Sequence, residues 1–197
     1  RQMCIRDRLV SYSNPTKEFL DDGISDVQEL VAFCARVSNP SNQHNKDTSE
    51  KLIKYLIKNK HWSPLEMVTA CIEIETTRDI ARQILRHRSF SFQEFSQRYA
   101  DPTKDLSFVT RDARLQDEKN RQNSVETEDM QLKKDWERKQ SELIDLSVKT
   151  YKWAIDNGIA KEQARAVLPE GNTVSRMYMN GTLRSWVHYI CLLYTSP

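Results

Sequence analysis

The stretch that most constrains this chain runs from Asp79 to Tyr99 and reads DIARQILRHRSFSFQEFSQRY. Its first half places apolar side chains at helical spacing, at Ile80, Ala81, Ile84 and Leu85. This spacing predicts a short amphipathic helix, with Asp79 at the position of an N-cap. From residue 89 onward, small or polar residues alternate with aromatic ones. The alternation predicts an extended segment that would place Glu94, Ser96 and Arg98 on one side.

The same stretch is the densest part of the chain in groups that can hold an anion. It contains four arginines and a histidine, together with amide, carboxylate and hydroxyl side chains. Arginine suits phosphate because its planar fork donates two parallel hydrogen bonds. Gln83, Arg86 and His87 are spaced i, i+3, i+4, so a continuous helix would bring their tips to one point. The alternative is a solvated basic helix face followed by a polar loop, since charge runs usually form surface.

Apolar periodicity predicts the elements around this stretch. Residues 67–76 alternate as a half-buried strand that leads into the predicted helix, and residues 173–180 alternate as a second strand. Helices are predicted at 26–37, about 48–58, 130–157, 161–168 and 183–190. The longest keeps a helical spacing of Trp136, Leu143, Ser147, Tyr151 and Ile155. Residues 10–22 are predicted as strand or loop, 106–110 as a short strand, and the charged residues 111–128 as a mobile surface excursion.

Composition limits the class of protein. A chain of 197 residues is long enough for one domain with a real core, and its formal net charge of +2 is too small to imply a polyanionic partner. No apolar run approaches the ~20 residues of a membrane helix, and no signal peptide is visible, so a cytoplasmic location is expected. The four cysteines form no C-x-x-C pair and the four histidines are scattered, which argues against zinc sites and disulfides.

One pattern within this stretch is recognisable. Arg86-His87-Arg88, followed after seven residues by Ser96, resembles the signature of the flavin-dependent thymidylate synthases. Gln83, Glu94 and Arg98 match the longer form of that signature.

Three further segments match the family in the right order. The segment from His61 to Glu66 resembles its H-x-[ST]-P-x-E motif, in which the hydroxyl residue, here Ser63, contacts flavin. The role of His61 stays open between function and a helix C-terminal cap. Arg165 matches a nucleotide-binding arginine, although from its surroundings alone it would be a surface residue. Arg184 and His188, at i and i+4, match positions that contact flavin.

The resemblance covers residues 27–190 and implies an α+β fold, an antiparallel sheet flanked by helices, in one domain over residues 9–190. It implies a homotetramer with active sites between subunits. The implied reaction is the reductive methylation of dUMP to dTMP, with methylenetetrahydrofolate as carbon donor and FAD, reduced by NADPH, as the cofactor. Neither a membrane nor a nucleic acid is an expected partner.

The resemblance also implies roles for individual residues. Flavin binding is expected of Ser63, Arg86, His87, Arg88, Glu94, Arg184 and His188. Binding of dUMP is expected of Gln83, Arg86, Glu94, Ser96, Gln97, Arg98 and Arg165. No residue is assigned as catalytic, because no base is placed beside Ser96, and no metal ligand is assigned. Arg36 follows the first predicted helix and is interpreted as a surface charge at a helix end.

The sequence departs from the family pattern near its end. A family arginine that helps to activate the pyrimidine should stand at position 193, where this chain has Leu193. Residues 1–8 and 191–197 are therefore expected to be non-native ends. Two alternatives follow. One is a catalytically impaired relative that still binds nucleotide or flavin. The other is a basic nucleic-acid-binding module in which Phe90, Phe92 and Phe95 stack on bases.

Overall fold

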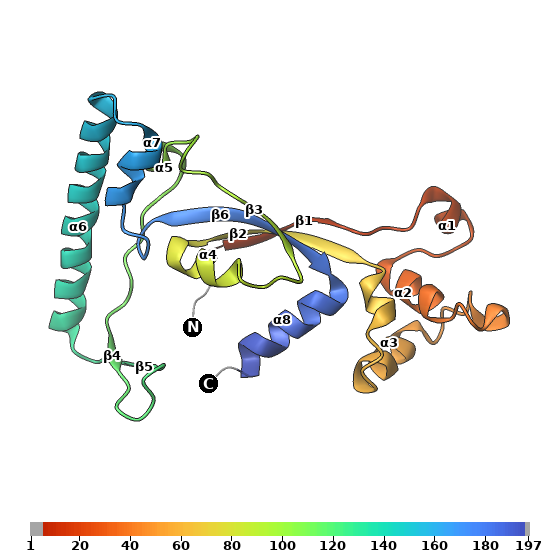
Figure 1. Ribbon diagram of the computed structural model, residues 1–197. Helices are drawn as coiled ribbons and strands as arrows, with labels where there is room; N and C mark the ends of the chain where they lie inside the picture. The colour runs from red at the N-terminus through yellow and green to blue at the C-terminus, as the bar shows by residue number, and fades with distance from the viewer. Residues whose placement is uncertain (1–5, 196–197) are drawn as a thin grey trace.

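The computed structural model describes residues 6–195, with side chains up to residue 191. The molecule is elongated, with an antiparallel sheet in its middle and helices at both ends (Figure 1). The strands are β1 (Arg6–Tyr12), β2 (Thr69–Thr77), β3 (Ser91–Glu94) and β6 (Val174–Thr182), in the order β1-β2-β6-β3. The predicted α+β fold with an antiparallel sheet flanked by helices is confirmed.

One face of this sheet carries the main core. Ile72 and Ile74 of β2 lie opposite Met179 and Met177 of β6, and all four point to the face covered by α4 (Arg78–Ile84) and α8 (Leu183–Thr195). The alternating pattern predicted for residues 67–76 is therefore a strand with one buried side. The buried members of this core are Ile74, Ala81, Ile84, Phe90, Met177, Met179, Trp186 and Tyr189.

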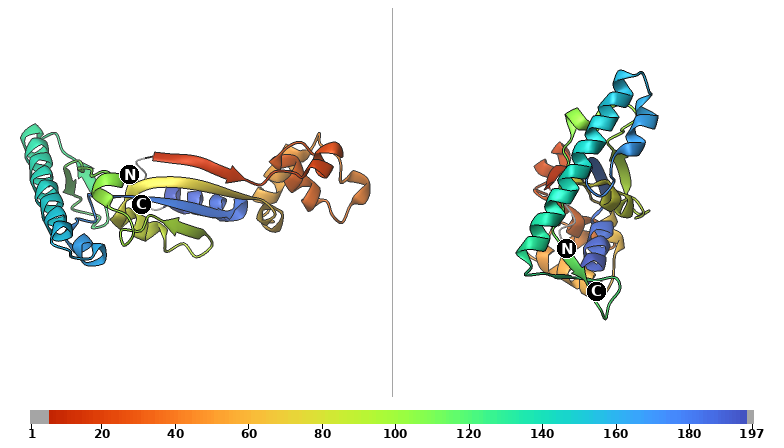
Figure 2. Two further views of the ribbon diagram at one scale, coloured as in Figure 1. Left: turned by 90° about the horizontal axis from the view of Figure 1, so that it is seen from above. Right: turned by 90° about the vertical axis from the view of Figure 1, so that its left-hand side faces the viewer.

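The opposite face of the sheet is polar. Arg176 donates two hydrogen bonds to Glu75 on the neighbouring strand, the shorter at 2.6 Å, and Arg8 of β1 pairs with Glu73 at 3.1 Å. Within residues 6–195, no helix covers this face, and the strands lie unobstructed when the molecule is seen from above (Figure 2). The sheet is thus one-sided in this chain, with an apolar face packed on two helices and a charged face left open.

Helices occupy the two ends of the sheet (Figure 2). At one end lie α1 (Lys17–Asp21), α2 (Val27–Ala35) and α3 (Ser49–Lys58), and at the other lie α6 (Met130–Asp156) and α7 (Lys161–Ala164). Asp26 caps α2 by accepting a hydrogen bond from the Glu29 backbone N–H at 2.8 Å; the sequence allowed either Ser25 or Asp26 in this position. A second buried cluster, formed by Tyr151, Ala154, Ala164 and Leu168, joins α6 to the segment that contains α7.

Several local predictions were wrong. Residues 17–21 form the helix α1, and the predicted mobile excursion contains a hairpin of β4 (Arg114–Gln116) and β5 (Ser124–Glu126). Asp117 organises its turn by accepting backbone hydrogen bonds from Lys119 and Asn120, an arrangement of polar groups that apolar periodicity cannot reveal. The predicted strand at 106–110 is reduced to a single bridge between Phe108 and Thr173, next to the short helix α5 (Pro102–Asp105).

Two predictions concern the ends of the chain and the absence of a membrane-spanning segment. Residues 1–5 and 196–197 lie outside it, so the prediction that residues 1–8 and 191–197 are non-native stays a prediction. Among the helices that the structure describes, none combines the length and the apolar character that crossing a membrane requires.

Candidate functional site

The signature stretch folds as helix, turn and strand. α4 begins at Arg78, with Thr77 as its N-cap, so the prediction of Asp79 as N-cap was wrong. α4 ends at Ile84, and the backbone then tightens, because the N–H of Arg86 bonds to Gln83 O and that of His87 to Ile84 O. The expectation that Gln83, Arg86 and His87 converge on one continuous helix face was therefore also wrong.

The turn is held against α8 and β6 by its aromatic residue. The Phe90 ring packs edge-on against Trp186 at 4.8 Å between centroids and against Tyr189 at 5.7 Å. It lies so close to Gly181 that a Cβ built there would come within 2.6 Å of Phe90 Cε1. The hydroxyl of Ser185 also donates a hydrogen bond to the backbone carbonyl of Ser89 at 3.2 Å. The loop that carries Arg86 and Arg88 is therefore fixed by buried packing at its base.

Three residues predicted to bind flavin gather between α8 and the 3₁₀ helix η2 (Ser63–Glu66). Arg184 forms an ion pair with Glu66, and the His188 ring packs edge-on against Trp62 at 4.6 Å. Ser63 begins η2 and is exposed. Glu66 and Trp62 were not predicted as site residues, but both lie in or beside the motif that suggested Ser63.

The signature loop joins this group from the other side of α8. The His87 ring meets Tyr189, the neighbour of His188, at 4.8 Å between centroids. Arg86 and Arg88 are exposed, and neither has an ion-pair or hydrogen-bond partner for its side chain among residues 6–191. Two unpaired guanidiniums so close in sequence repel each other, and an anion bound between them would relieve that repulsion.

Glu94 lies apart from this flavin group and belongs to a second cluster. It accepts a hydrogen bond from the Ser175 hydroxyl at 2.7 Å, and its Oε1 lies 3.7 Å from Nη1 of Arg78. Arg78 was not predicted, because nothing in the sequence indicates that a residue 16 positions before Glu94 lies beside it. Its side chain is 11% exposed, and burial lowers the pKa of its guanidinium, an effect that Glu94 opposes.

Arg98 and Arg165 are brought together by a shared partner. Arg98 forms an ion pair with the Glu162 carboxylate at 3.4 Å, and Nε of Arg165 donates to the Glu162 backbone carbonyl at 3.1 Å. Arg165 is close enough to Arg78 for their charges to interact, which links these arginines to Glu94. The tertiary structure thus joins three of the residues predicted to bind dUMP, from β3, the following loop and the 3₁₀ helix η3 (Arg165–Val167), which directly follows α7.

The remaining predicted dUMP-binding residues have different environments. Gln97 is buried, and its Nε2 has no hydrogen-bond partner among the described residues. An unpaired buried amide is costly unless a ligand accepts its hydrogen bond. Ser96 accepts a hydrogen bond from the Arg98 backbone N–H at 3.3 Å, because the chain turns there instead of continuing as a strand. Gln83 is exposed on α4, and its backbone carbonyl accepts the hydrogen bond from the Arg86 N–H that tightens the turn.

Two further predictions concern single residues. Arg36 is buried, not a surface charge as expected: its guanidinium donates to the carbonyl of Asn45 and, at 2.8 Å, to the hydroxyl of Thr48. It ties the end of α2 to the start of α3. The prediction about Leu193 concerns a side chain that lies outside the described residues.

Comparison with known proteins gives results that agree with one another. A family model described as "Thymidylate synthase complementing protein" (Thy1) matches residues 20–196. A probable flavin-dependent thymidylate synthase of Paramecium bursaria Chlorella virus 1 is 46% identical over 183 residues, which are 93% of this chain and 82% of that protein. A flavin-dependent thymidylate synthase of Synechocystis is 49% identical over 92% of this chain and 81% of that protein.

A solved structure shows the same fold. The crystal structure of the UMP/dUMP methylase PolB from Streptomyces cacaoi, bound with 5-Br dUMP, superimposes with a TM-score of 0.74 at 24% sequence identity. The match covers 93% of this chain and 75% of that one.

Proposed function

Since this chain belongs to the flavin-dependent thymidylate synthases, a family of methyltransferases, we propose that it converts dUMP to dTMP by reductive methylation. In this proposal methylenetetrahydrofolate donates the carbon, and the cofactor is FAD that NADPH reduces. The observation that carries the proposal is the pair of exposed, unpaired guanidiniums of Arg86 and Arg88 on a loop anchored by Phe90.

The residues present fit a bound flavin nucleotide. Arg86 and Arg88 can each present a planar fork to phosphate oxygens without first breaking an internal ion pair. His188 and Arg184 lie on α8 beside Ser63 and offer ring and hydrogen-bonding groups to the same ligand. The cofactor would supply the hydride chemistry, whereas these residues bind and orient it.

The second cluster fits a nucleotide monophosphate. Arg98 pairs with the carboxylate of Glu162 and Arg165 with its backbone carbonyl, so two guanidiniums lie near one residue, an arrangement that suits a phosphate. Glu94 is held in a fixed position by Ser175 and Arg78, so its carboxylate can accept hydrogen bonds from a pyrimidine ring or a ribose hydroxyl. The unpaired Nε2 of Gln97 can donate to the same ligand. In this proposal the cluster binds dUMP.

We further propose that active sites form between subunits of a homotetramer. The flavin group is built around α8 and η2, whereas the dUMP group is built around β3, α7 and the loop between β3 and α5. The open, charged face of the sheet gives each chain a surface available for association. A second chain could therefore complete a site that each chain carries only in parts.

The first test is a visible absorption spectrum of the purified protein. We expect bound flavin, which NADPH bleaches anaerobically in the presence of dUMP. Arg86→Ala combined with Arg88→Ala should lose the flavin, whereas Arg121→Ala, an exposed arginine on the β4–β5 hairpin, should retain it. A folded protein that remains colourless and takes up no added FAD would overturn the proposal.

Product analysis then separates the enzyme from an impaired relative. Formation of dTMP from dUMP and methylenetetrahydrofolate would establish turnover. Binding of both flavin and dUMP without dTMP would instead identify a protein that retains the two sites but has lost the reaction.

A further inference from the structure

α6 has two adjacent long faces, one packed on the protein and one exposed. The packed face buries Gln140, Ser147, Tyr151 and Ala154, and the apolar residues Ile144, Val148 and Ile155 are half-buried. Gln140 there bonds to both the N–H and the carbonyl of Arg111, at 2.8 and 2.9 Å. The helix is therefore attached to the protein both through these hydrogen bonds and through the buried cluster of Tyr151, Ala154, Ala164 and Leu168.

The neighbouring face of α6 carries large apolar side chains in water. We call these residues the α6 stripe: Leu132 (40% exposed), Trp136 (45%), Leu143 (49%), Leu146 (63%) and Trp153 (62%). Along the helix they occupy positions that alternate in steps of three and four, with Lys139 and Thr150 at the two remaining places. This is the a/d heptad spacing with which one helix packs against another.

Such a stripe is unfavourable in an isolated chain. Burial of apolar surface contributes about 25 cal/mol per Å², and each tryptophan has one of the largest such surfaces of any side chain. α6 thus exposes Trp136 and Trp153 although they are the largest apolar side chains that it carries. An exposed apolar patch of this kind marks an interaction site.

We propose that the α6 stripe pairs with the α6 stripe of a second copy of this chain, in antiparallel orientation about a two-fold axis between Leu143 and Leu146. In this register Leu143 meets Leu146 of the partner subunit, and Trp136 meets Trp153 of the partner subunit. Each contact occurs twice, because a two-fold interface is self-complementary.

The polar residues favour the antiparallel orientation. In a parallel pair Lys139 would face Lys139 of the partner subunit, and two ammonium groups would meet inside the seam. In the antiparallel register Lys139 lies beside Thr150 of the partner subunit instead. Glu142, which borders the stripe, then approaches Lys149 of the partner subunit, so that opposite charges flank the leucines at both ends.

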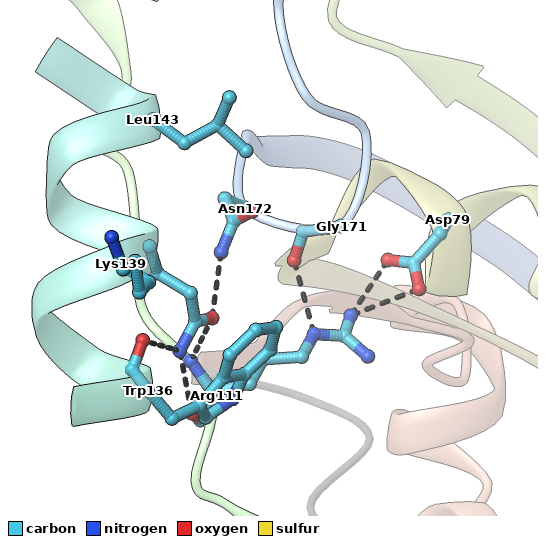
Figure 3. Close-up of a pocket in the computed structure, with 8 residues that line it drawn as sticks. Asp79, Arg111, Trp136, Lys139, Leu143, Gly171 and Asn172 are labelled. Carbon is cyan, nitrogen blue, oxygen red and sulfur yellow. Dashed lines mark hydrogen bonds and ion pairs between the residues drawn. The ribbon is translucent and has the colours of Figure 1, made fainter. Parts of the chain in front are cut away.

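The surface beside the stripe can accommodate a partner. A groove of about 270 Å³ runs along α6 and is lined by Trp136 and Leu143 on one side and by Arg111 and Asp79 on the other (Figure 3). Arg111 is held there by Asp79 at 2.7 Å and by the Gly171 carbonyl at 3.0 Å. The groove thus has a fixed polar wall, and its apolar wall belongs to the stripe.

This inference deepens the self-association that the proposed function includes, by assigning one of its interfaces. Light scattering after size exclusion and sedimentation equilibrium would measure the mass and the dissociation constant of the assembly. We expect Leu143→Glu combined with Leu146→Glu to halve the mass of the assembly, with an unchanged circular dichroism spectrum. Lys152→Glu, on the side of α6 away from the stripe, is the matched control and should leave the mass unchanged.

A charge exchange at two exposed positions tests the register. Because Glu142 also pairs with Arg138 and Lys139 on its own helix, circular dichroism must show that each variant keeps its helix content. Glu142→Lys alone, or Lys149→Glu alone, places like charges across the seam and should raise the dissociation constant about tenfold or more. The two together restore opposite charges and should recover the original affinity. Equal dissociation constants for all four proteins, or an assembly that survives the two leucine substitutions, would overturn the proposal, as would a monomeric starting protein.

The same samples distinguish this inference from the proposed function. Flavin binding without any effect of the α6 substitutions on mass refutes the inference and leaves the proposed function standing. Charge rescue in a protein that binds no flavin supports the inference and refutes the proposed function.

Discussion

Replacement of Gly181 by alanine tests whether Phe90 anchors the signature loop. Gly181 lies on β6 at the face covered by α8, opposite Ala70 of β2. A Cβ added there would lie 2.6 Å from Phe90 Cε1, closer than packed atoms tolerate, so the ring must move. That ring is packed against Trp186 and Tyr189, which leaves it little freedom to do so.

The expected cost follows from two opposing effects. Overpacking of a core costs about 1–3 kcal/mol, whereas Gly→Ala restricts the unfolded chain and returns about 0.4–1 kcal/mol. The net destabilisation of Gly181→Ala should be about 1–2 kcal/mol, which lowers Tm by roughly 2–8 °C for a chain of this size. Because Phe90 follows Arg88 by two residues, its displacement should also weaken flavin binding.

Gly171→Ala is the matched control, because a Cβ there meets nothing within 4 Å. It should leave Tm unchanged or raise it slightly. Phe90→Leu provides a second check: with the ring gone, Gly181→Ala should cost about 1 kcal/mol less than in the parent chain. Thermal melts and FAD titrations of the four variants measure these effects. A Gly181→Ala protein that melts and binds FAD like the parent would refute the proposed anchoring.

Three further predictions concern single side chains. Arg78→Met removes the guanidinium that positions Glu94. Steady-state kinetics should then show a KM for dUMP raised about tenfold, with little change in Tm. An unchanged KM would contradict this role of Arg78. Gln97→Met replaces a buried amide that has an unpaired Nε2. Urea unfolding should show a free energy of unfolding raised by about 1–3 kcal/mol, whereas calorimetry should show weaker dUMP binding. A loss of stability would show that the amide has a hydrogen-bond partner in the folded protein. The backbone N–H of Ser25 holds the pKa of Glu29 below its usual 4.5. The parent protein should therefore have a higher Tm than Glu29→Gln at pH values above 4.5, and this difference should disappear as pH falls through the lowered pKa. A difference in Tm that stays constant across this pH range would exclude a stabilising role for the Glu29 carboxylate.

The sequence alone determined features that depend on neighbouring residues. The alternation in residues 67–76 predicted a strand with one buried side, and the N-cap of α2 was narrowed to Ser25 or Asp26, of which Asp26 is the cap. Thr182 stands directly before the last helix, a position in which threonine is a common N-cap, and its hydroxyl accepts a hydrogen bond from the Ser185 N–H at 3.2 Å. The signature residues were recognisable because the family pattern consists of residues that lie only a few positions apart in the sequence. Capping hydrogen bonds and side-chain alternation each involve residues a few positions apart, so both can be predicted from a short stretch of sequence.

Local reasoning failed where distant segments meet. Arg36 and Arg78 gave no sign of burial, because their partners, Thr48 and Glu94, come from other elements. Glu94 was predicted to bind both flavin and dUMP, and only the tertiary structure shows that it lies beside Arg78, in the cluster that includes Arg98. Ion pairs of this kind form only after the chain has brought the two groups together.

α6 shows the same division most clearly. Its sequence predicted a long helix, because apolar residues recur at helical spacing through Trp136, Leu143 and Tyr151. The sequence did not indicate which face of the helix would be buried, since both faces contain apolar side chains that could pack. In the structure Tyr151 packs inward with Ala164 and Leu168, and Gln140 bonds to the backbone of Arg111, which leaves Trp136 and Leu143 exposed. Periodicity determines a helix, but only its tertiary contacts decide which side of it remains available to a partner.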